Sequence, residues 1–328
     1  MISYKSFASQ LYTLNAASFE NIAISLCHFQ ARHNPVYRQY IESLKLELDS
    51  VQRLEQIPFL PISFFKEHVI RTEDWEPEAE FISSGTTGQV ASRHLVRDMS
   101  LYLDHAKRCF EQSFGALSGY HLLALLPSYL ERKGSSLVTM IDSFIQATQS
   151  PYSGFYLHDQ EKLLKDIEAL RGGDRQVILW GVTFALLDLA EKFAPDLSHS
   201  MIVETGGMKG RRYEITRQEL HNALTKGFNV STVYSEYGMT EMLSQAYTRG
   251  GDTFFCPPSL KVLIRDITDP FQVGIAGMGG VNVIDLANIH SVAFLETGDI
   301  GKTHSDGSFQ VMGRLDNSDV RGCNLLVE

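Results

Sequence analysis

The residues best suited to phosphate chemistry lie in one short stretch, FISSGTTGQVASRH, residues 81–94. Within it, Ser83–Gly88 packs two serines, two threonines and two glycines into six positions. Glycines let backbone N–H groups turn toward an anion, and hydroxyls add donors without bulk. The stretch lacks the Gly-Lys-Ser/Thr ending of a P-loop. It predicts a phosphate-binding loop of another kind, and its alternative is a plain turn.

Three more motifs follow along the chain: YSEYGMTE at 234–241, TGD at 297–299 and GRLDN at 313–317. Each has an ordinary structural alternative, such as a core aromatic, a helix start or a turn. Taken in order with the Ser83–Gly88 stretch, they resemble the superfamily of adenylate-forming enzymes, which includes acyl-CoA synthetases, luciferases and the adenylation domains of peptide synthetases.

That resemblance implies ATP and Mg²⁺ as cofactors. Tyr237 would stack on adenine, Thr240 would bond the α-phosphate and Glu241 would bind Mg²⁺. Asp299 would accept hydrogen bonds from the ribose hydroxyls, and Arg314 would reach ribose or phosphate. The nucleotide-binding residues implied are Ser83, Ser84, Gly85, Thr86, Thr87, Gly88, Gly206, Gly207, Tyr237, Gly238, Met239, Thr240, Asp299 and Arg314.

A narrower resemblance covers most of the chain from about residue 57 onward. The segments PFLPISFFKEH, LLPSYLERKGSSL, TGGMKGR and VRGCNL look like the LuxE type of acyl-protein synthetase, which is similar to phenylacetate-CoA ligases. It implies that a fatty acid is activated as acyl-AMP and moved to a cysteine near the C-terminus. The partner implied is an acyl-CoA reductase-like protein or an acyl carrier.

The C-terminal residues suggest how the acyl group would be accepted. The chain stops at Glu328, 12 residues after Asp316, so we expect it to lack the small mobile C-terminal domain that carries a catalytic lysine in related enzymes. Cys323 lies seven residues after Asp316, and an extended chain of that length reaches roughly 20 Å. A thiolate is a good nucleophile, and Arg321 nearby would help to lower the thiol pKa. The alternative is that Cys323 is a small apolar residue in a terminal strand.

Another cation must then neutralise charge at the α-phosphate. Lys209, in the TGGMKGR loop, is the first candidate, and its alternative is a solvated loop lysine. His94 and Arg93 are the others. His94 would carry a proton or act as a base toward Cys323, and a surface histidine is its alternative.

Other residues carry weaker signals. Trp180, Gly181 and Phe184, at the end of an expected strand, would line an apolar tunnel for the acid or belong to the core. Cys27 and Cys109 are expected to be structural, and Cys256 is less certain.

The elements expected to position these residues form an α/β fold. Residues 1 to about 56 have helical periodicity. The apolar runs at 121–126, 176–181 and 200–207 read as buried parallel strands, with helices at 161–171 and 215–227. Short β-like segments follow residue 255. We therefore expect the large-domain portion of the adenylate-forming fold, divided into a helical segment (1–75), an α/β nucleotide- and acyl-binding core (76–255) and a β-rich subdomain with a truncated tail (256–328).

The charge and composition restrict the partners. A net charge of -10 and a pI of about 5.6 provide no basic field for nucleic acid. No stretch is apolar for long enough to cross a membrane, and four separated cysteines fit a cytoplasmic protein. Two rival functions remain: a ligase that passes the acyl group to CoA or a carrier-protein thiol, and a nucleotide-binding subunit without catalysis.

Overall fold

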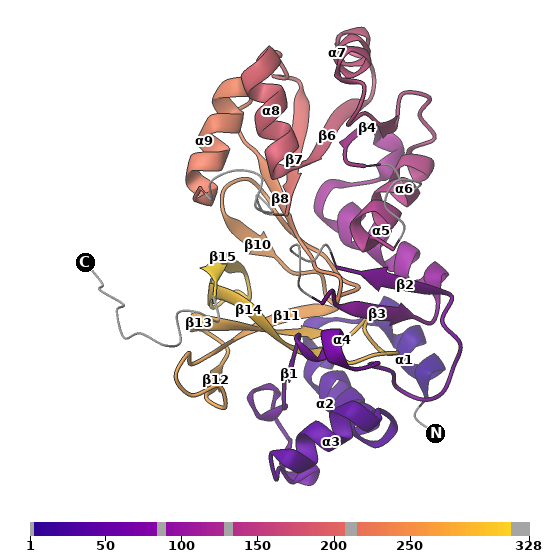
Figure 1. Cartoon of the computed structure of the whole chain (residues 1–328), viewed down its shortest axis with the longest axis vertical. Coiled ribbons are helices and arrows are strands. Elements are labelled where there is room, and N and C mark those ends of the chain that lie inside the picture. Colours follow the sequence, from indigo (N-terminus) through magenta and orange to yellow (C-terminus); the bar gives the residue numbers. More distant parts are fainter. Residues whose placement is uncertain (1–2, 84–89, 128–133, 207–214, 316–328) are drawn as a thin grey trace, which may run out of the picture.

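The computed structural model describes residues 3–83, 90–127, 134–206 and 215–315 (Figure 1). The helices are α1 Tyr4–Gln10, α2 Ala16–His33, α3 Pro35–Ser43, α4 Phe64–Glu67, α5 Met99–Phe114, α6 Ser136–Thr148, α7 Gln160–Ala169, α8 Thr183–Phe193 and α9 Arg217–Phe228, with short 3₁₀ turns at Leu11–Thr13, Leu48–Ser50, Leu54–Gln56 and Leu117–Gly119. The strands are β1 Leu60–Pro61, β2 Ala79–Ile82, β3 Arg93–Val96, β4 Tyr120–Leu125, β5 Gly154–Phe155, β6 Gln176–Val182, β7 Ser200–Thr205, β8 Tyr234–Tyr237, β9 Ala246–Thr248, β10 Thr253–Phe255, β11 Leu260–Arg265, β12 Val273–Gly274, β13 Gly277–Asp285, β14 Phe294–Thr303 and β15 Phe309–Arg314.

One long sheet runs through the molecule in the order β12-β11-β13-β14-β15-β10-β9-β8-β7-β6-β4-β5. Strands β4 to β8 pair in parallel, as expected for unbroken apolar runs. The rest of the sheet, from β8 through β9, β10, β15, β14, β13 and β11 to β12, pairs antiparallel. Strands β2 and β3 form a separate antiparallel hairpin. The mixed α/β fold with a β-rich C-terminal part is therefore confirmed. The divisions at residues 76 and 256 stay predictions, although hydrogen-bonded strands lie on both sides of the second.

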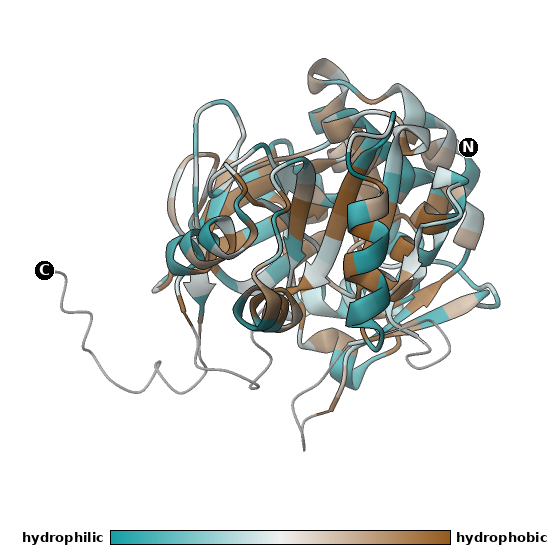
Figure 2. Ribbon diagram, turned by 90° about the horizontal axis from the view of Figure 1, so that it is seen from above, coloured by the Kyte–Doolittle hydropathy of each residue, from teal (hydrophilic) through white to brown (hydrophobic). Residues whose placement is uncertain are grey.

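Helices cover both faces of the parallel strands. Figure 1 shows α8 and α9 on one side of β6 and β7, and α5 and α6 on the other. Apolar strands lie between helices whose outer faces are polar (Figure 2). On the α5 side the core is aromatic, because the ring of Trp180 lies about 6 Å from the rings of Phe110, Phe144 and Tyr247. Truncating such a buried aromatic ring typically costs about 3–5 kcal/mol of stability.

The expected N-terminal helices begin at side-chain caps. The Asn15 side chain accepts hydrogen bonds from the first turn of α2, and Asn34 caps α3, which has Pro35 at its first position. These caps satisfy backbone N–H groups that lack partners inside the helix.

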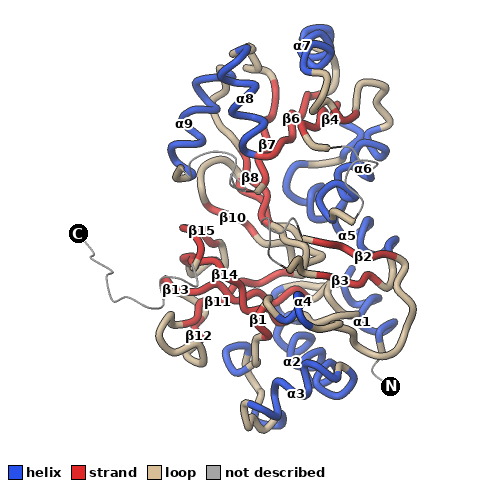
Figure 3. The backbone as a smooth tube through the Cα atoms, viewed as in Figure 1, coloured by secondary structure: helices blue, strands red, loops and turns tan. Residues whose placement is uncertain are grey.

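The N-terminal helices pack against the strands that are last in sequence. The Gln30 side chain donates to the carbonyl oxygens of Asn288 and Ile289, and its Oε1 accepts from the amide of Ala293. Strand β1 pairs in parallel with β14. In Figure 3, α2 and α3 lie at the same end of the molecule as β1, β11 and β12.

Candidate functional site

A chain of three side chains joins the predicted motifs at the middle of the sheet. The Tyr237 hydroxyl, at the end of β8, donates to Asp299 Oδ2 at 2.7 Å. Arg314 Nε donates to Asp299 Oδ1 at 3.1 Å. The backbone brings these groups together because Asp299 on β14 lies opposite Arg314 on β15. Three residues from separate motifs therefore form one polar corner, which we call the Asp299 corner.

The Asp299 corner is only partly open to solvent. Side-chain exposure is 74% for Arg314 but only 7% for Asp299. The Tyr237 ring is 7% exposed and packs edge-on against Phe309, at 5.2 Å between centroids. Burial raises the pKa of Tyr237, and the adjacent Asp299 carboxylate adds to the shift. The Tyr237 phenol therefore stays protonated and donates its hydrogen bond to the Asp299 carboxylate. The stacking of Tyr237 on adenine stays a prediction.

The backbone of Gly238 passes close to Glu236 in the turn after β8. A Cβ atom at Gly238 would lie 2.4 Å from Glu236 Oε1, so a larger residue there would force this carboxylate to move. Glu236 itself is hydrogen-bonded to Thr205 Oγ1 at the end of the neighbouring strand β7. The backbone can therefore pass close to this carboxylate before it reaches Met239, Thr240 and Glu241.

Glu241 places a carboxylate beside the Asp299 corner. The residue is 5% exposed, and burial raises the pKa of its carboxyl, while a hydrogen bond with Ser92 and the charges of Arg314 and Lys66 partly offset the shift. A bound divalent cation would favour the ionised form of such a group. Among the described residues, no group of three or more His, Cys, Asp or Glu side chains could hold a metal ion.

His94 lies directly behind Thr240. It is fully buried, so the alternative of a surface histidine is wrong. Its Nδ1 lies 2.7 Å from the carbonyl oxygen of Thr240, and its Nε2 lies 3.0 Å from Ser291 Oγ. Because a carbonyl oxygen only accepts, we assign the proton to Nδ1. Burial lowers the pKa of the ring, and the predicted role as a base toward Cys323 is untested.

Two buried side chains, Asp285 at the end of β13 and Asn288 just after it, hold the backbone of residues 241–244. Asp285 Oδ2 accepts from the amides of Leu243 and Ser244, at 2.7 and 3.0 Å, and Asn288 Nδ2 donates to the carbonyl oxygen of Glu241 at 2.7 Å. Both residues are fully buried. With His94 they form a set of three side chains, which we call the cradle. It fixes the backbone of residues 240–244 without using the side chains of Thr240 and Glu241, and the Glu241 carboxyl is itself buried and hydrogen-bonded with Ser92.

The hairpin β2–β3 carries the predicted phosphate loop. Ser83 closes its described part, because the Ser83 amide donates to the Ser92 carbonyl oxygen and the Ser92 amide donates to Ser83 Oγ. Gly206, at the end of β7, has φ 73°, a left-handed conformation that favours glycine. Its carbonyl oxygen accepts from the Thr183 hydroxyl. The other predicted residues of these loops and the predicted acyl acceptor lie outside the described residues, namely Ser84, Gly85, Thr86, Thr87, Gly88, Gly207, Lys209 and Cys323.

The three described cysteines and the expected acyl tunnel belong to packed regions. Cys27 and Cys109 are buried, as expected, and burial raises the pKa of each thiol to about 12. Cys256 is partly exposed, and burial around its thiol also raises the pKa to about 12. Trp180 is fully buried in the aromatic core, and a Cβ at Gly181 would lie 2.8 Å from a Leu186 carbon. These contacts support the core alternative over a tunnel at Trp180.

Sequence reasoning missed Asp285, Asn288 and Arg265, a buried arginine on β11. A signal was present: polar residues interrupt apolar runs in LKVLIRDI and GGVNVIDLANIHS, where a buried strand calls for apolar side chains. Such interruptions mark buried polar groups that need partners.

The comparisons with known proteins concern the fold. The ATP-bound structure of MatB from Rhodopseudomonas palustris superposes with a TM-score of 0.55 at 15% identity, covering 74% of this chain and 50% of that one. The luciferase-like enzyme of the nonluminescent mealworm Zophobas morio superposes with a TM-score of 0.50 at 18% identity, covering 75% of this chain and 60% of that one. These neighbours are adenylate-forming enzymes, and the chain has the adenylate-forming fold.

The likeness extends over only part of the neighbours. The chain spans about half the length of MatB and 60% of the luciferase-like enzyme. No family model matches the sequence, and no curated protein matches it. No helix in the described part of the chain is long and apolar enough to cross a membrane.

Proposed function

We propose that the protein activates a carboxylic acid with ATP to form an acyl-adenylate. The observation that carries this proposal is the Asp299 corner, in which Tyr237, Asp299 and Arg314 form one hydrogen-bonded chain next to Glu241. The adenylate-forming fold and the ATP-bound neighbour support it. A carboxylate that is held by a phenol and a guanidinium suits the hydroxyl groups of a ribose, which donate hydrogen bonds.

The described residues divide the work on the nucleotide. Asp299 binds the ribose, and Arg314 contacts the ribose or the phosphates. Thr240 bonds the α-phosphate through its hydroxyl, while His94 acts from behind by holding the Thr240 carbonyl. Ser83–Gly88, of which only Ser83 is a described residue, surrounds the β- and γ-phosphates.

In the first step an oxygen of the acid attacks the α-phosphorus of ATP. A new P–O bond forms, the bond from the α-phosphorus to the bridging oxygen of the β-phosphate breaks, and pyrophosphate leaves with that electron pair. The negative charge that gathers on the α-phosphate needs a cation. Lys209 is the proposed source, and Arg314 and Lys66 are cations among the described residues whose charges act on Glu241.

The residues fit one Mg²⁺ ion. Mg²⁺ commonly takes one or two protein carboxylates and completes its shell with water and substrate phosphates, so Glu241 alone is a sufficient protein ligand. When bound, Mg²⁺ supplies positive charge to the phosphate oxygens. The chain contributes by keeping the Glu241 backbone fixed through Asn288.

In the second step we propose that the acyl group moves to Cys323. The thiolate attacks the acyl carbon, the carbon–oxygen bond to phosphate breaks, and AMP leaves with the electrons, which produces a thioester. A fatty acid as substrate, a reductase-like protein or acyl carrier as recipient, and a cytoplasmic location complete the proposal. They rest on the resemblance of the sequence to LuxE-type synthetases.

The test is ATP–pyrophosphate exchange with Mg²⁺ and acids from acetate through long-chain fatty acids to aryl acids. We expect exchange that depends on one acid class. If none of the acids supports exchange although ATP still binds, the proposal is contradicted, and a nucleotide-binding subunit without catalysis is favoured.

The acyl acceptor is tested on the same samples by intact mass. Cys323→Ser should abolish covalent acylation and leave exchange unchanged, while Cys256→Ser is the matched control and should keep both. If Cys323→Ser still delivers the acyl group to CoA or to a carrier-protein thiol at the wild-type rate, the external-thiol ligase is the correct function.

A further inference from the structure

Strand β14 breaks its pairing with β13 just before Asp299. Gly280 lies opposite Ile300, but Asn282 lies opposite Glu296, so residues 297–299 face Val281 alone. Such a bulge interrupts the ladder of backbone hydrogen bonds and turns the strand. On the β13 side, something other than the ladder must therefore hold residues 297–299, while Asp299 stays paired with Arg314 of β15 on the other side.

Arg265 on β11 donates hydrogen bonds to the carbonyl groups at this break. Its Nη1 donates to the Val281 carbonyl oxygen and to Asn282 Oδ1, both at 2.9 Å. Its Nη2 donates to the Thr297 carbonyl oxygen at 2.7 Å. The residue is 5% exposed, and its Nε lies 3.7 Å from Glu296 Oε1. One planar guanidinium thus ties both sides of the bulge together.

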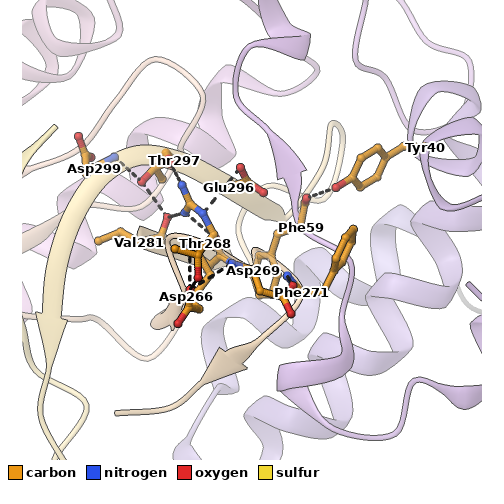
Figure 4. A network of polar contacts seen from close by, with 12 residues as sticks. Tyr40, Phe59, Asp266, Thr268, Asp269, Phe271, Val281, Glu296, Thr297 and Asp299 are labelled. Carbon is orange, nitrogen blue, oxygen red and sulfur yellow. Dashed lines mark hydrogen bonds and ion pairs between the residues drawn. The ribbon is translucent and has the colours of Figure 1, made fainter. Parts of the chain in front are cut away.

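The Thr297 hydroxyl links these contacts to Asp299. Thr297 Oγ1 donates to the Val281 carbonyl oxygen at 2.8 Å and accepts from the Asp299 amide at 3.1 Å. Figure 4 shows Val281, Glu296 and Thr297 gathered at one point, with Asp299 next to Thr297. Two hydrogen bonds, through Thr297 Oγ1, therefore connect the Asp299 amide to the Val281 carbonyl oxygen that Arg265 also binds.

The space for the guanidinium is provided by a glycine. A Cβ at Gly280 would lie 2.5 Å from Arg265 Cζ, so a larger residue there would displace the arginine. The contacts also need the two-armed shape of arginine, because a lysine ammonium cannot donate from two fixed points.

We propose that Arg265 is a positioning residue that, through Val281 and Thr297, sets the Asp299 carboxylate for the ribose of ATP. This inference rests on the proposed function. The ladder with β15 holds Asp299 on one side, whereas on the β13 side a buried charge and a buried hydroxyl replace the ladder. A change at Arg265 or at Thr297 should therefore weaken the hydrogen bond that a ribose hydroxyl donates to the Asp299 carboxylate.

The experiment compares ATP with 3′-deoxy-ATP in pyrophosphate exchange, using wild type, Thr297→Val and Arg265→Lys. Hydrogen bonds to charged groups contribute enough that we expect wild type to prefer ATP by about tenfold or more in kcat/KM. In both variants the preference should fall to about threefold or less. Thr303→Val is the matched control, because this buried threonine of β14 donates to the Ile275 carbonyl oxygen and, among the described residues, makes no hydrogen bond with Asp299. It should keep the wild-type preference.

The outcomes separate the two proposals. A wild type that neither binds ATP nor catalyses exchange overturns the proposed function and this inference with it. An active wild type whose preference persists within twofold in Thr297→Val overturns the inference alone. If Arg265→Lys does not fold, Thr297→Val decides, since it removes one hydroxyl at nearly constant volume. Loss of preference in Thr303→Val as well would also overturn the inference, because the effect would then be a general one of the strand.

Discussion

The cradle and the Asp299 corner hold their polar groups in opposite ways. In the cradle, His94, Asp285 and Asn288 are fully buried and bind backbone groups of residues 240–244. In the corner, Asp299 is bound through its own carboxylate, and its partner Arg314 is largely exposed. The first arrangement fixes a segment so that its side chains stay available. The second prepares a functional group that a ligand can contact, so damage to the cradle should act on folding and damage to the corner on binding.

The largest effect should come from Asp285→Ala. The change leaves the amides of Leu243, Ser244 and Ala287 and the Ser244 hydroxyl without their acceptor. Each unsatisfied buried donor costs about 1–3 kcal/mol, so we expect a loss of about 4 kcal/mol or more in unfolding free energy. Chemical denaturation measures it.

The control is Asp104→Ala on the exposed side of α5, which should change stability by less than about 0.5 kcal/mol. A stable Asp285→Ala protein that has lost only activity would remove the distinction between cradle and corner.

Acid should destabilise the cradle and its surroundings more than the corner, because His105 contacts Ser244 and His290 stacks on His94. Burial lowers the pKa of His94 and of His105, whose value falls to about 4, and burial with the nearby His94 and Arg97 lowers that of His290. Below pH 6.5 the unfolded chain binds more protons at these groups, so unfolding free energy falls as the pH drops from 6.5 to about 4. His105 alone accounts for about 3 kcal/mol, and Glu241, with its raised pKa, offsets part of this near pH 4.5.

Denaturation at several pH values tests this, with His290→Phe as the variant. Neither ring nitrogen of His290 has a hydrogen-bond partner in the described part of the chain, so an apolar ring should be tolerated at neutral pH and should flatten the acid slope. The exposed His199→Gln should leave the slope unchanged. An unchanged slope in His290→Phe would show that this ring is not among the sensitive groups.

The corner should respond to Asp299→Asn in binding rather than in folding. The amide keeps one acceptor oxygen but loses the charge, so we expect kcat/KM for ATP in pyrophosphate exchange to fall by about 10–100-fold, with a change of less than about 1 kcal/mol in unfolding free energy. Asp252→Asn, at an exposed carboxylate that accepts from Gln310, is the matched control. A similar loss in stability as in Asp285→Ala would mean that the corner, too, is a folding element.

The smallest effect should follow Arg93→Ala. Arg93 pairs with Glu80 across the β2–β3 hairpin at 2.5 Å, but its side chain is 59% exposed, and exposed pairs contribute little. We expect stability within about 0.5 kcal/mol and exchange within twofold of wild type, as for the distant surface control Arg171→Ala. A loss of exchange above tenfold would instead support Arg93 as the cation for the α-phosphate.

The sequence predicted much of the fold because long apolar runs leave few choices. The runs at 121–126 and 176–181 are strands β4 and β6, paired in parallel as expected. The four motifs also predicted one site for Tyr237, Asp299 and Arg314, and these three side chains lie together in the structure. A motif is recognised from the side chains that are expected to contact a ligand, and so these residues could be predicted.

The supports of the site were not predictable in the same way. Asp285, Asn288 and Arg265 bind backbone atoms, and any residue offers the same backbone atoms, so the partner leaves no trace in the sequence. The bulge at Val281 depends on the register of two strands. This register shifts by two residues between Gly280 and Asn282, and a shift of two keeps the same side chains on each face, so the apolar pattern does not reveal it.

The contacts of Gln30 have a consequence for how the chain folds. This side chain, early in the sequence, holds backbone groups at residues 288, 289 and 293, which are about 260 positions later. During synthesis those partners emerge about 260 residues after Gln30, so α2 must wait for them. Contacts between such distant positions slow folding, because a very long loop has to close before they form. The segment that supplies Asn288 and Ser291 should therefore mature late, and nascent chains should acquire nucleotide binding only after strand β14 has left the ribosome.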